Sequence, residues 1–411
     1  MRVPSFHAFR CGRAFVVVVE PTPKLWSWGC NESGQLGLGN TIRRSSPVQV
    51  GALTTWSNVF GGSSGSAFAT KTDGTLWAWG ANGTGQLGLG NTTNRSSPVQ
   101  VGALTDWSDA KISSNRSITL AVKSNGTLWA WGLGGYGSLA QVGKQSLTNR
   151  SSPVQVGTLT NWAEVSVGFG NVLAVKTDGT LWSWGFGVEG GLGQGNTTNR
   201  SSPVQVGALT NWSKVVAIPH AGLATKTDGT LWAWGRNNVG QLGQGNTTNR
   251  SSPVQVGALT NWSKIAGSGS RYTGYYSYIY GFFSSIKTDG TLWSWGFNQY
   301  AELGLGNTTN RSSPVQVGAL TDWSKLSITS HAAYASAGNM TALIKTNGTL
   351  WAWGYRRNGS FADGSAENRV SSPVQVLSGT SGWDWVSVIN SPAFTFIPVG
   401  AGPSIIAIRT S

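Results

Sequence analysis

Hydrophobic and polar positions along the chain follow one repeating pattern. Its clearest copy, Lys226 to Lys264, reads KTDGTLWAWGRNNVGQLGQGNTTNRSSPVQVGALTNWSK. Within it, LWAWG alternates with a period of two and carries apolar groups on both faces, which is typical of a strand buried on both sides. The pattern LWxWG occurs seven times, and SSPVQV follows each copy. Copies 50 to 61 residues apart indicate an array of supersecondary units rather than a series of independent domains.

Each repeat predicts four short antiparallel strands. Strand A begins at a Trp-Ser pair, and strand B ends at Lys-Thr-Asp-Gly, where Asp-Gly supplies the backbone of a tight hairpin turn. Strand C is LWxWG, and strand D begins at the proline of PVQV, where a missing N–H does least harm. Four strands repeated seven times predict an all-β fold, a single seven-bladed β-propeller of four-stranded antiparallel blades.

The two ends of the chain decide how the ring closes. Val16–Glu20 and Ile405–Arg409 both align with strand B, so one of them is in excess. We expect the C-terminal A and B strands, Trp385–Ile389 and Ile405–Arg409, to join the N-terminal C and D strands, which displaces Val16–Glu20. Such closure removes open sheet edges. Residues 1–24 are then an N-terminal extension, and residues 25–411 form the propeller.

Three sequence elements in a fixed order resemble a known family. LWxWG, then GQLGLG, then SSPVQV is similar to the repeat of the regulator of chromosome condensation (RCC1-like) family, over residues 25–411. The resemblance implies a β-propeller that acts as an interaction platform. The G-W-R-H-T motif of the family's plant photoreceptor and the wedge insertion of its exchange factor have no match here, so neither activity is implied.

The net charge of +14 would ordinarily suggest a polyanionic partner such as nucleic acid. Much of this charge is dictated by the repeat, because one basic residue ends each strand B and one arginine precedes each strand D. We expect two rings near opposite faces that support loops and solubility, and binding of nucleic acid through them is an alternative function. The rings are Lys71, Lys123, Lys176, Lys226, Lys287, Lys345 and Arg409, and Arg44, Arg95, Arg150, Arg200, Arg250, Arg311 and Arg369.

The chain offers little catalytic or metal-binding chemistry. Its fifteen carboxylates stand mostly alone or in turns, so they suggest no acid–base pair. His7, His220 and His331 are isolated in the sequence. We therefore expect no catalytic residues, no metal and no other cofactor. Cys11 and Cys30 are either a disulfide between the extension and the first blade or two free thiols.

Eighteen N-x-[ST] sequons bear on the source of the protein. A eukaryotic secreted protein with so many would be coated in glycan, so the pattern favours a bacterial or viral source and an extracellular, cell-surface or virion location. We expect no cleaved signal peptide in residues 1–24, because AFVVVV is short and runs into Glu-Pro-Thr-Pro. No stretch is long enough to span a bilayer.

The copies differ most between strands A and B, where three consecutive units carry long loops that the strand order places on one face with the C-to-D loops. We interpret this face as the partner-binding site of a non-enzymatic protein-interaction module or scaffold; a carbohydrate-active or other enzyme using the same face is an alternative. The first long loop could instead extend strands A and B or plug the axial channel. The predicted site residues are Arg271, Tyr272, Tyr275, Tyr276, Tyr278, Tyr280, Phe282, His331, Tyr334, Phe394 and Phe396.

Overall fold

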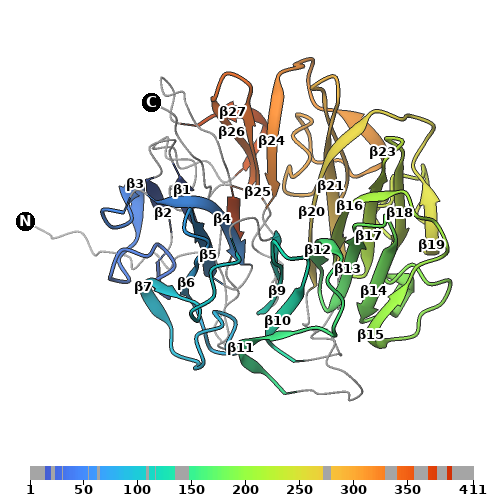
Figure 1. The fold of residues 1–411 in the computed structure, drawn as a ribbon. Coiled ribbons are helices and arrows are strands. Elements are labelled where there is room, and N and C mark those ends of the chain that lie inside the picture. Colours follow the sequence, from blue (N-terminus) through green and yellow to red (C-terminus); the bar gives the residue numbers. More distant parts are fainter. Residues whose placement is uncertain are drawn as a thin grey trace, which may run out of the picture.

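Seven four-stranded antiparallel blades make up the protein (Figure 1). The computed structural model describes residues 14–19, 24–29, 31–53, 55–62, 65–107, 111–115, 117–134, 148–271, 279–328, 340–355, 369–376 and 387–390. Within each blade the strands follow the order A, B, C, D, and each strand A contacts strand A of the blades on either side, which closes a circle. The prediction of a seven-bladed all-β propeller is confirmed.

The strand bounds, in the order A to D, are as follows. Blade 1 has β28 (Ser387–Asn390), β1 (Ala14–Val19), β2 (Leu25–Gly29) and β3 (Arg44–Gln49). Blade 2 has β4 (Trp56–Gly62), β5 (Ser66–Lys71), β6 (Leu76–Gly80) and β7 (Arg95–Gln100). Blade 3 has β8 (Lys111–Asn115), β9 (Ile118–Val122), β10 (Leu128–Gly132) and β11 (Arg150–Gln155). Blade 4 has β12 (Trp162–Val167), β13 (Asn171–Lys176), β14 (Leu181–Gly185) and β15 (Arg200–Gln205), with the short 3-10 helix η2 (Val188–Gly190).

The remaining blades continue the same order. Blade 5 has β16 (Trp212–Ile218), β17 (Ala221–Lys226), β18 (Leu231–Gly235) and β19 (Arg250–Gln255). Blade 6 has β20 (Trp262–Arg271), β21 (Ile279–Lys287), β22 (Leu292–Gly296) and β23 (Arg311–Gln316). Blade 7 has β24 (Trp323–Ile328), β25 (Met340–Lys345), β26 (Leu350–Tyr355) and β27 (Arg369–Gln375). No helix among the described residues has the length and apolar character that crossing a membrane requires.

The ring closes differently from the sequence-based expectation. β1 pairs with β2, with Val17 opposite Ser27, so the predicted displacement of Val16–Glu20 is wrong. β28 pairs with the other edge of β1, which gives blade 1 one strand from the C-terminal part and three from the N-terminal part. The local β1–β2 pairing closes a much shorter loop than pairing with Ile405–Arg409 would, and it therefore costs less chain entropy. Residues 405–409 lie outside the described residues.

Strand C holds each blade to the preceding one. In LWxWG the leucine, the third residue and the second tryptophan are buried, and the first tryptophan is half-buried. In blades 2, 3, 6 and 7 the second tryptophan donates its indole N–H across the blade junction, for example from Trp79 to the Gln35 carbonyl at 2.9 Å and from Trp131 to the Gln86 carbonyl at 2.8 Å. This bond satisfies a buried donor that would otherwise destabilise the fold.

The basic residue at the end of strand B lies between two tryptophans of its own blade. The Lys71 ammonium is 3.6 Å from the centroid of the Trp77 ring and 5.2 Å from that of Trp56, and the two indoles meet edge to face. Matching contacts occur at Lys123, Lys176, Lys226, Lys287 and Lys345. Burial lowers the pKa of Lys71, and the nearby Asp73 carboxylate offsets only part of this lowering. These six lysines are at most 8% exposed, so this ring stabilises the blades and offers little charge to a polyanion.

The B-to-C turn is hydrogen-bonded to the first tryptophan of strand C through a threonine. Asp73 accepts hydrogen bonds from the Thr75 hydroxyl at 2.6 Å and the Thr75 N–H at 2.9 Å, and the Trp77 indole donates to the same hydroxyl at 2.8 Å. Gly74 is required here, because its φ is 79° and a Cβ atom would lie 1.8 Å from the Thr105 carbonyl oxygen. The turn aspartates are structural, as the sequence indicated.

Removal of β1 tests the closure. Deleting residues 1–19 leaves β2 and β28 with no strand between them, whereas deleting residues 1–13 keeps all paired strands. At about 0.5–1.5 kcal/mol for each lost ladder hydrogen bond, we expect the longer deletion to cost several kcal/mol of unfolding free energy, measured by urea denaturation. Equal midpoints for the two truncations would show that β1 does not close the ring.

The turn aspartates should control stability in acid. Hydrogen bonds from the following threonine, first its hydroxyl and then its N–H, hold the pKa of each turn aspartate below its usual 3.8. A lowered folded-state pKa gives stability that is present above the unfolded-state pKa and is lost as pH falls through the folded-state pKa. Replacing Asp73, Asp178, Asp228 and Asp289 by Asn, which blades 3 and 7 already use, should preserve the melting temperature at about pH 7 and flatten its decline below about pH 4. An unchanged acid limb would contradict this assignment.

Candidate functional site

The A-to-B and C-to-D loops occupy one face of the propeller, here called the loop face. The Tyr280 ring of β21 stacks on Phe297 of the C-to-D loop, with centroids 4.1 Å apart and planes 19° from parallel. Phe297 in turn contacts Tyr300, at 6.1 Å between centroids. The prediction that both loop types share a face is confirmed in blade 6.

The first long loop begins as an extension of its two strands. β20 has 10 residues and β21 has 9, against 7 and 6 for β16 and β17 of blade 5. This hairpin lies close to the A-to-B turn of blade 5: a Cβ atom on Gly281 would be 2.4 Å from Ile218 Cδ1, and one on Gly269 would be 2.7 Å from Pro219 Cδ. Glycines without side chains permit this approach, and strand extension therefore accounts for both ends of the insertion.

The structure places three of the predicted site residues. Arg271 is the last residue of β20 and lies opposite Ile279 at the end of the described hairpin. Phe282 is fully buried and Tyr280 is 8% exposed, so these two side chains support the loop and do not form its surface, which corrects their assignment. The other predicted site residues lie outside the described residues, as do Cys11 and Cys30: Tyr272, Tyr275, Tyr276, Tyr278, His331, Tyr334, Phe394 and Phe396.

A charged cluster on the same face was missed by the sequence analysis. The Glu189 carboxylate in η2 of blade 4 lies 3.0 Å from Nδ1 of His220, in the A-to-B turn of blade 5, and accepts a hydrogen bond of 2.5 Å from Nη1 of Arg236, in the C-to-D loop of blade 5. His220 also meets the edge of the Phe186 ring at 5.2 Å. The three residues thus come from three segments and two blades, and His220 is not isolated.

This cluster is held by an unusual backbone. Glu189 and His220 have φ values of 59° and 58°, a region that non-glycine residues rarely adopt. Burial raises the pKa of the Glu189 carboxyl, but hydrogen bonds from His220 and Arg236 and the charge of Arg236 outweigh it, so the net pKa is lowered. His220 is 3% exposed, and its Nε2 has no hydrogen-bond partner among the described residues. Strain of this kind is frequent at functional sites.

The signal for this cluster was present in the repeat alignment. Glu189 occupies the position held by Val239 in blade 5 and by Tyr300 in blade 6, and Arg236 occupies the position of Phe297. These are the C-to-D loop positions at which the copies diverge. The sequence positions of histidines and carboxylates do not show which residues of different blades lie side by side.

The contacts on this face continue into blade 7. The Arg369 guanidinium carbon lies 5.3 Å from the centroid of the Tyr300 ring, and its Nη1 donates to the Gln299 carbonyl at 3.4 Å. Glu189, His220, Arg236, Phe297, Tyr300 and Arg369 are called here the loop-face sector. It combines aromatic surface with paired charges, and no group of three or more His, Cys, Asp or Glu that could bind a metal occurs in the described part of the chain.

Comparison with known proteins identifies the family. The model described as "Regulator of chromosome condensation (RCC1) repeat" matches residues 24–69, 73–122, 125–175, 178–218, 228–274 and 289–343. The chain belongs to the RCC1 repeat family. A second RCC1 repeat model matches residues 110–138. The family suggested by the LWxWG and SSPVQV motifs is therefore confirmed.

Relatives of this RCC1-repeat propeller differ in what they do. The Arabidopsis thaliana ultraviolet-B receptor UVR8 is 30% identical over 193 residues, which cover 45% of this chain and 43% of the receptor. The human probable E3 ubiquitin-protein ligase HERC3 is 30% identical over 186 residues, covering 44% of this chain and 17% of the ligase. The chain thus matches less than half the length of these curated relatives.

Solved structures agree on the fold. Saccharomyces cerevisiae Prp20p superposes with a TM-score of 0.74 at 18% identity, covering 97% of this chain and 92% of Prp20p. Human WBSCR16 superposes with a TM-score of 0.71 at 20% identity, covering 89% and 96%. At these identities the likeness establishes the propeller architecture alone.

Removal of the Glu189 carboxylate should show how much the cluster contributes to the stability of the fold. Glu189→Ala leaves the partly buried Arg236 without its anion and His220 without its Nδ1 partner, so we expect a loss of about 1–3 kcal/mol in unfolding free energy. Glu164→Ala is the matched control, because its ion pair with the half-exposed Lys214 should be worth less than about 1 kcal/mol. Chemical denaturation measures both, and equal losses would mean that the cluster is an ordinary surface ion pair.

Proposed function

We propose that this RCC1-repeat propeller is a non-enzymatic protein-interaction module that binds its partner through the loop-face sector. The observation that carries the proposal is the concentration of divergent residues on one face of otherwise nearly identical blades. Aromatic rings and arginine side chains from blades 4 to 7 gather there, and such residues dominate protein interfaces energetically.

The predicted loop residues would extend this surface. Tyr272, Tyr275, Tyr276 and Tyr278 follow the end of β20 directly, and tyrosine offers large contact area and a hydroxyl at low entropic cost. His331, Tyr334, Phe394 and Phe396 belong to the loops of the next two units, and we propose that they complete the binding face. Arg271 stands at the base of the first loop.

Structures of relatives support a protein partner. One solved complex contains Kap60 bound to yeast RCC1, and Prp20p is described with binding properties to Gsp1p and histones. These partners belong to those proteins, and they show that a propeller with this fold can serve as a binding platform. The expectation of a bacterial or viral source and of a cell-surface or virion location stays a prediction from the sequons.

Two alternatives have less support. An enzyme would need an available acid or base, but the carboxylate of the loop-face sector is already bonded to Arg236 and His220. Nucleic-acid binding through the ring of strand B lysines would need exposed ammonium groups, and the six described ones lie against tryptophan rings. The aromatic and charged sector fits protein recognition better.

Replacing the first long loop tests the proposal. Residues 269–281 are exchanged for a Pro-His turn equivalent to Pro219-His220, which closes the same pair of strands in blade 5. We expect partner capture from extracts of the native source, quantified by mass spectrometry, to be lost. The unfolding free energy should fall by only about 0.5–1.5 kcal/mol, the contribution of the lost Tyr280–Phe297 stack.

The control lies on the opposite face. Leu53→Ser and Leu104→Ser alter exposed residues of the D-to-A connections, at 47% and 46% exposure, and should leave capture unchanged. A folded loop-exchange protein that still captures the same partners would refute the loop face as the binding site. Loss of capture in the leucine variants alone would assign binding to the opposite face.

A further inference from the structure

One position of the C-to-D loop separates the blades into two kinds. It is the middle residue of a Gly-x-Gly segment that lies at the junction with the next blade. In blades 1, 2 and 6 it is leucine, and Leu38, Leu89 and Leu305 pack against buried hydrophobic clusters. In blades 4 and 5 it is glutamine, Gln194 and Gln244. The flanking glycines keep the same left-handed backbone in both kinds, so only the side chain differs.

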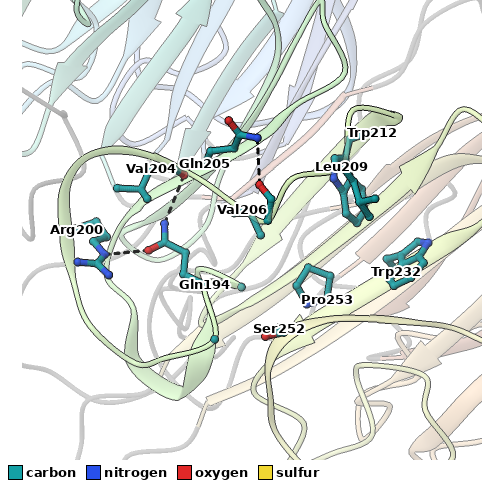
Figure 2. Close-up of a pocket in the computed structure, with 13 residues that line it drawn as sticks. Gln194, Arg200, Val204, Gln205, Val206, Leu209, Trp212, Trp232, Ser252 and Pro253 are labelled. Atoms are coloured by element: carbon teal, nitrogen blue, oxygen red, sulfur yellow. Dashed lines mark hydrogen bonds between the residues drawn. The ribbon is translucent and has the colours of Figure 1, made fainter.

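Each glutamine lines an open crevice between two blades. The crevice between blades 4 and 5 has a volume of about 420 Å³, and that between blades 5 and 6 has about 330 Å³. Figure 2 shows the first one, with Gln194 and Arg200 on one side and Trp212, Leu209 and Trp232 on the other. Both volumes lie in the range of small-ligand sites.

The polar side of the first crevice is fixed by hydrogen bonds. The Gln194 amide nitrogen donates to Ser183 Oγ at 2.9 Å, and its amide oxygen accepts from Arg200 Nε at 2.9 Å (Figure 2 shows the second bond). This bond holds the Arg200 side chain at the crevice, and its Nη groups have no acceptor among the described residues. Gln244 is likewise fixed in the second crevice, by donation to the Gln255 carbonyl at 3.1 Å.

The other walls are apolar and include exposed surface. The Trp212 and Trp232 rings meet edge to face at 5.9 Å, and the Lys226 ammonium lies 3.8 Å from the centroid of Trp232. Leu209 is 48% exposed, close to the 43–47% of the equivalent leucines in the other repeats, so its side chain is available to a ligand. The crevice therefore offers aromatic and aliphatic surface together with oriented amide and guanidinium groups.

We propose that each of these two crevices binds one unit of an oligosaccharide. A sugar ring presents both C–H surface, which indole, leucine and proline can cover, and hydroxyl groups, which need the donors and acceptors of an amide or guanidinium. A purely apolar ligand would gain nothing from glutamine in place of leucine. Each crevice has a glutamine, a leucine, a proline and two indoles, and the first also has Arg200. Two such crevices on adjacent blades suit a ligand with repeating units, because binding of one unit raises the effective concentration of the next.

The crevices use other side chains than the loop-face sector, although Gln194 and Glu189 share one C-to-D loop. Trp212 begins β16 and pairs with Lys226 next to the B-to-C turn, at the opposite end of the blade from the A-to-B turn at Ile218–Ala221. Saccharide binding and capture of a protein partner can therefore be disrupted independently.

The repeat supplies its own test variants. Gln194→Leu with Gln244→Leu converts both crevices to the kind found in blades 1, 2 and 6, so the double variant should fold with an unchanged melting temperature. The probes are short, defined cello-, chito-, malto- and oligogalacturonate chains, measured by saturation-transfer NMR and calorimetry on the full chain. We expect at least one series to bind at two sites, and the double variant to lose about 10-fold or more in affinity, because a site built for hydroxyl groups depends on its polar partners.

Leu89→Gln is the reverse variant. The junction of blades 2 and 3 has the same residue types as the second crevice, with Trp107, Trp129 and Leu104 in place of Trp262, Trp293 and Leu259. This substitution should raise the number of saccharide sites from two to three. The proposal is overturned if no series binds, if the double variant binds as the parent does, or if the leucine variant binds an apolar probe more tightly while saccharides fail to bind either form.

Discussion

In blades 2, 3, 6 and 7, a tryptophan whose ring is buried attaches the blade to the preceding one by an N–H bond. Trp79, Trp131, Trp295 and Trp353 all donate to a carbonyl of the preceding C-to-D loop. A large buried ring supplies most of the packing free energy of the junction, and a bond to a fixed carbonyl sets the distance between blades. The glycines of the C-to-D loop follow from this, since a Cβ atom on Gly88 would lie only 3.0 Å from the Trp131 indole nitrogen.

The first tryptophan of LWxWG has a second task within its own blade. With the tryptophan of strand A it holds a lysine against two indoles, and through a threonine it is bonded to the B-to-C turn. Framework contacts therefore account for much of the tryptophan content and part of the basic charge. The large positive charge of this chain is consequently a poor guide to a polyanionic partner, because six of its lysines are buried against tryptophan rings.

Divergence between repeats gives the loop face its particular side chains. The loop-face sector arises from C-to-D and A-to-B positions outside the strands, so Glu189, Arg236 and Tyr300 stand there without change to the ring. The two inter-blade crevices are lined by glutamine at a position where three other blades have leucine. Both features leave the tryptophan framework intact, which is why one architecture can carry different surfaces.

The sequence by itself determined the blade number, the four strands of each blade and the structural role of the turn aspartates. These depend on local chemistry. The period-two alternation of LWxWG occurs seven times, and the turn before it is Asp-Gly in four copies and Asn-Gly in two. It also indicated correctly that the A-to-B and C-to-D loops share a face, because an up-and-down strand order leaves no other arrangement.

Only the tertiary structure decided the rest. The choice of β1 as the second strand of blade 1 depended on which of two matching segments pairs at lower cost in chain entropy, and the match to the repeat does not contain that information. The burial of Phe282 and Tyr280 depended on how far β20 and β21 extend over blade 5. The Glu189–His220–Arg236 cluster joins residues up to 47 positions apart, from two blades, and no spacing rule in the sequence brings them within hydrogen-bond distance.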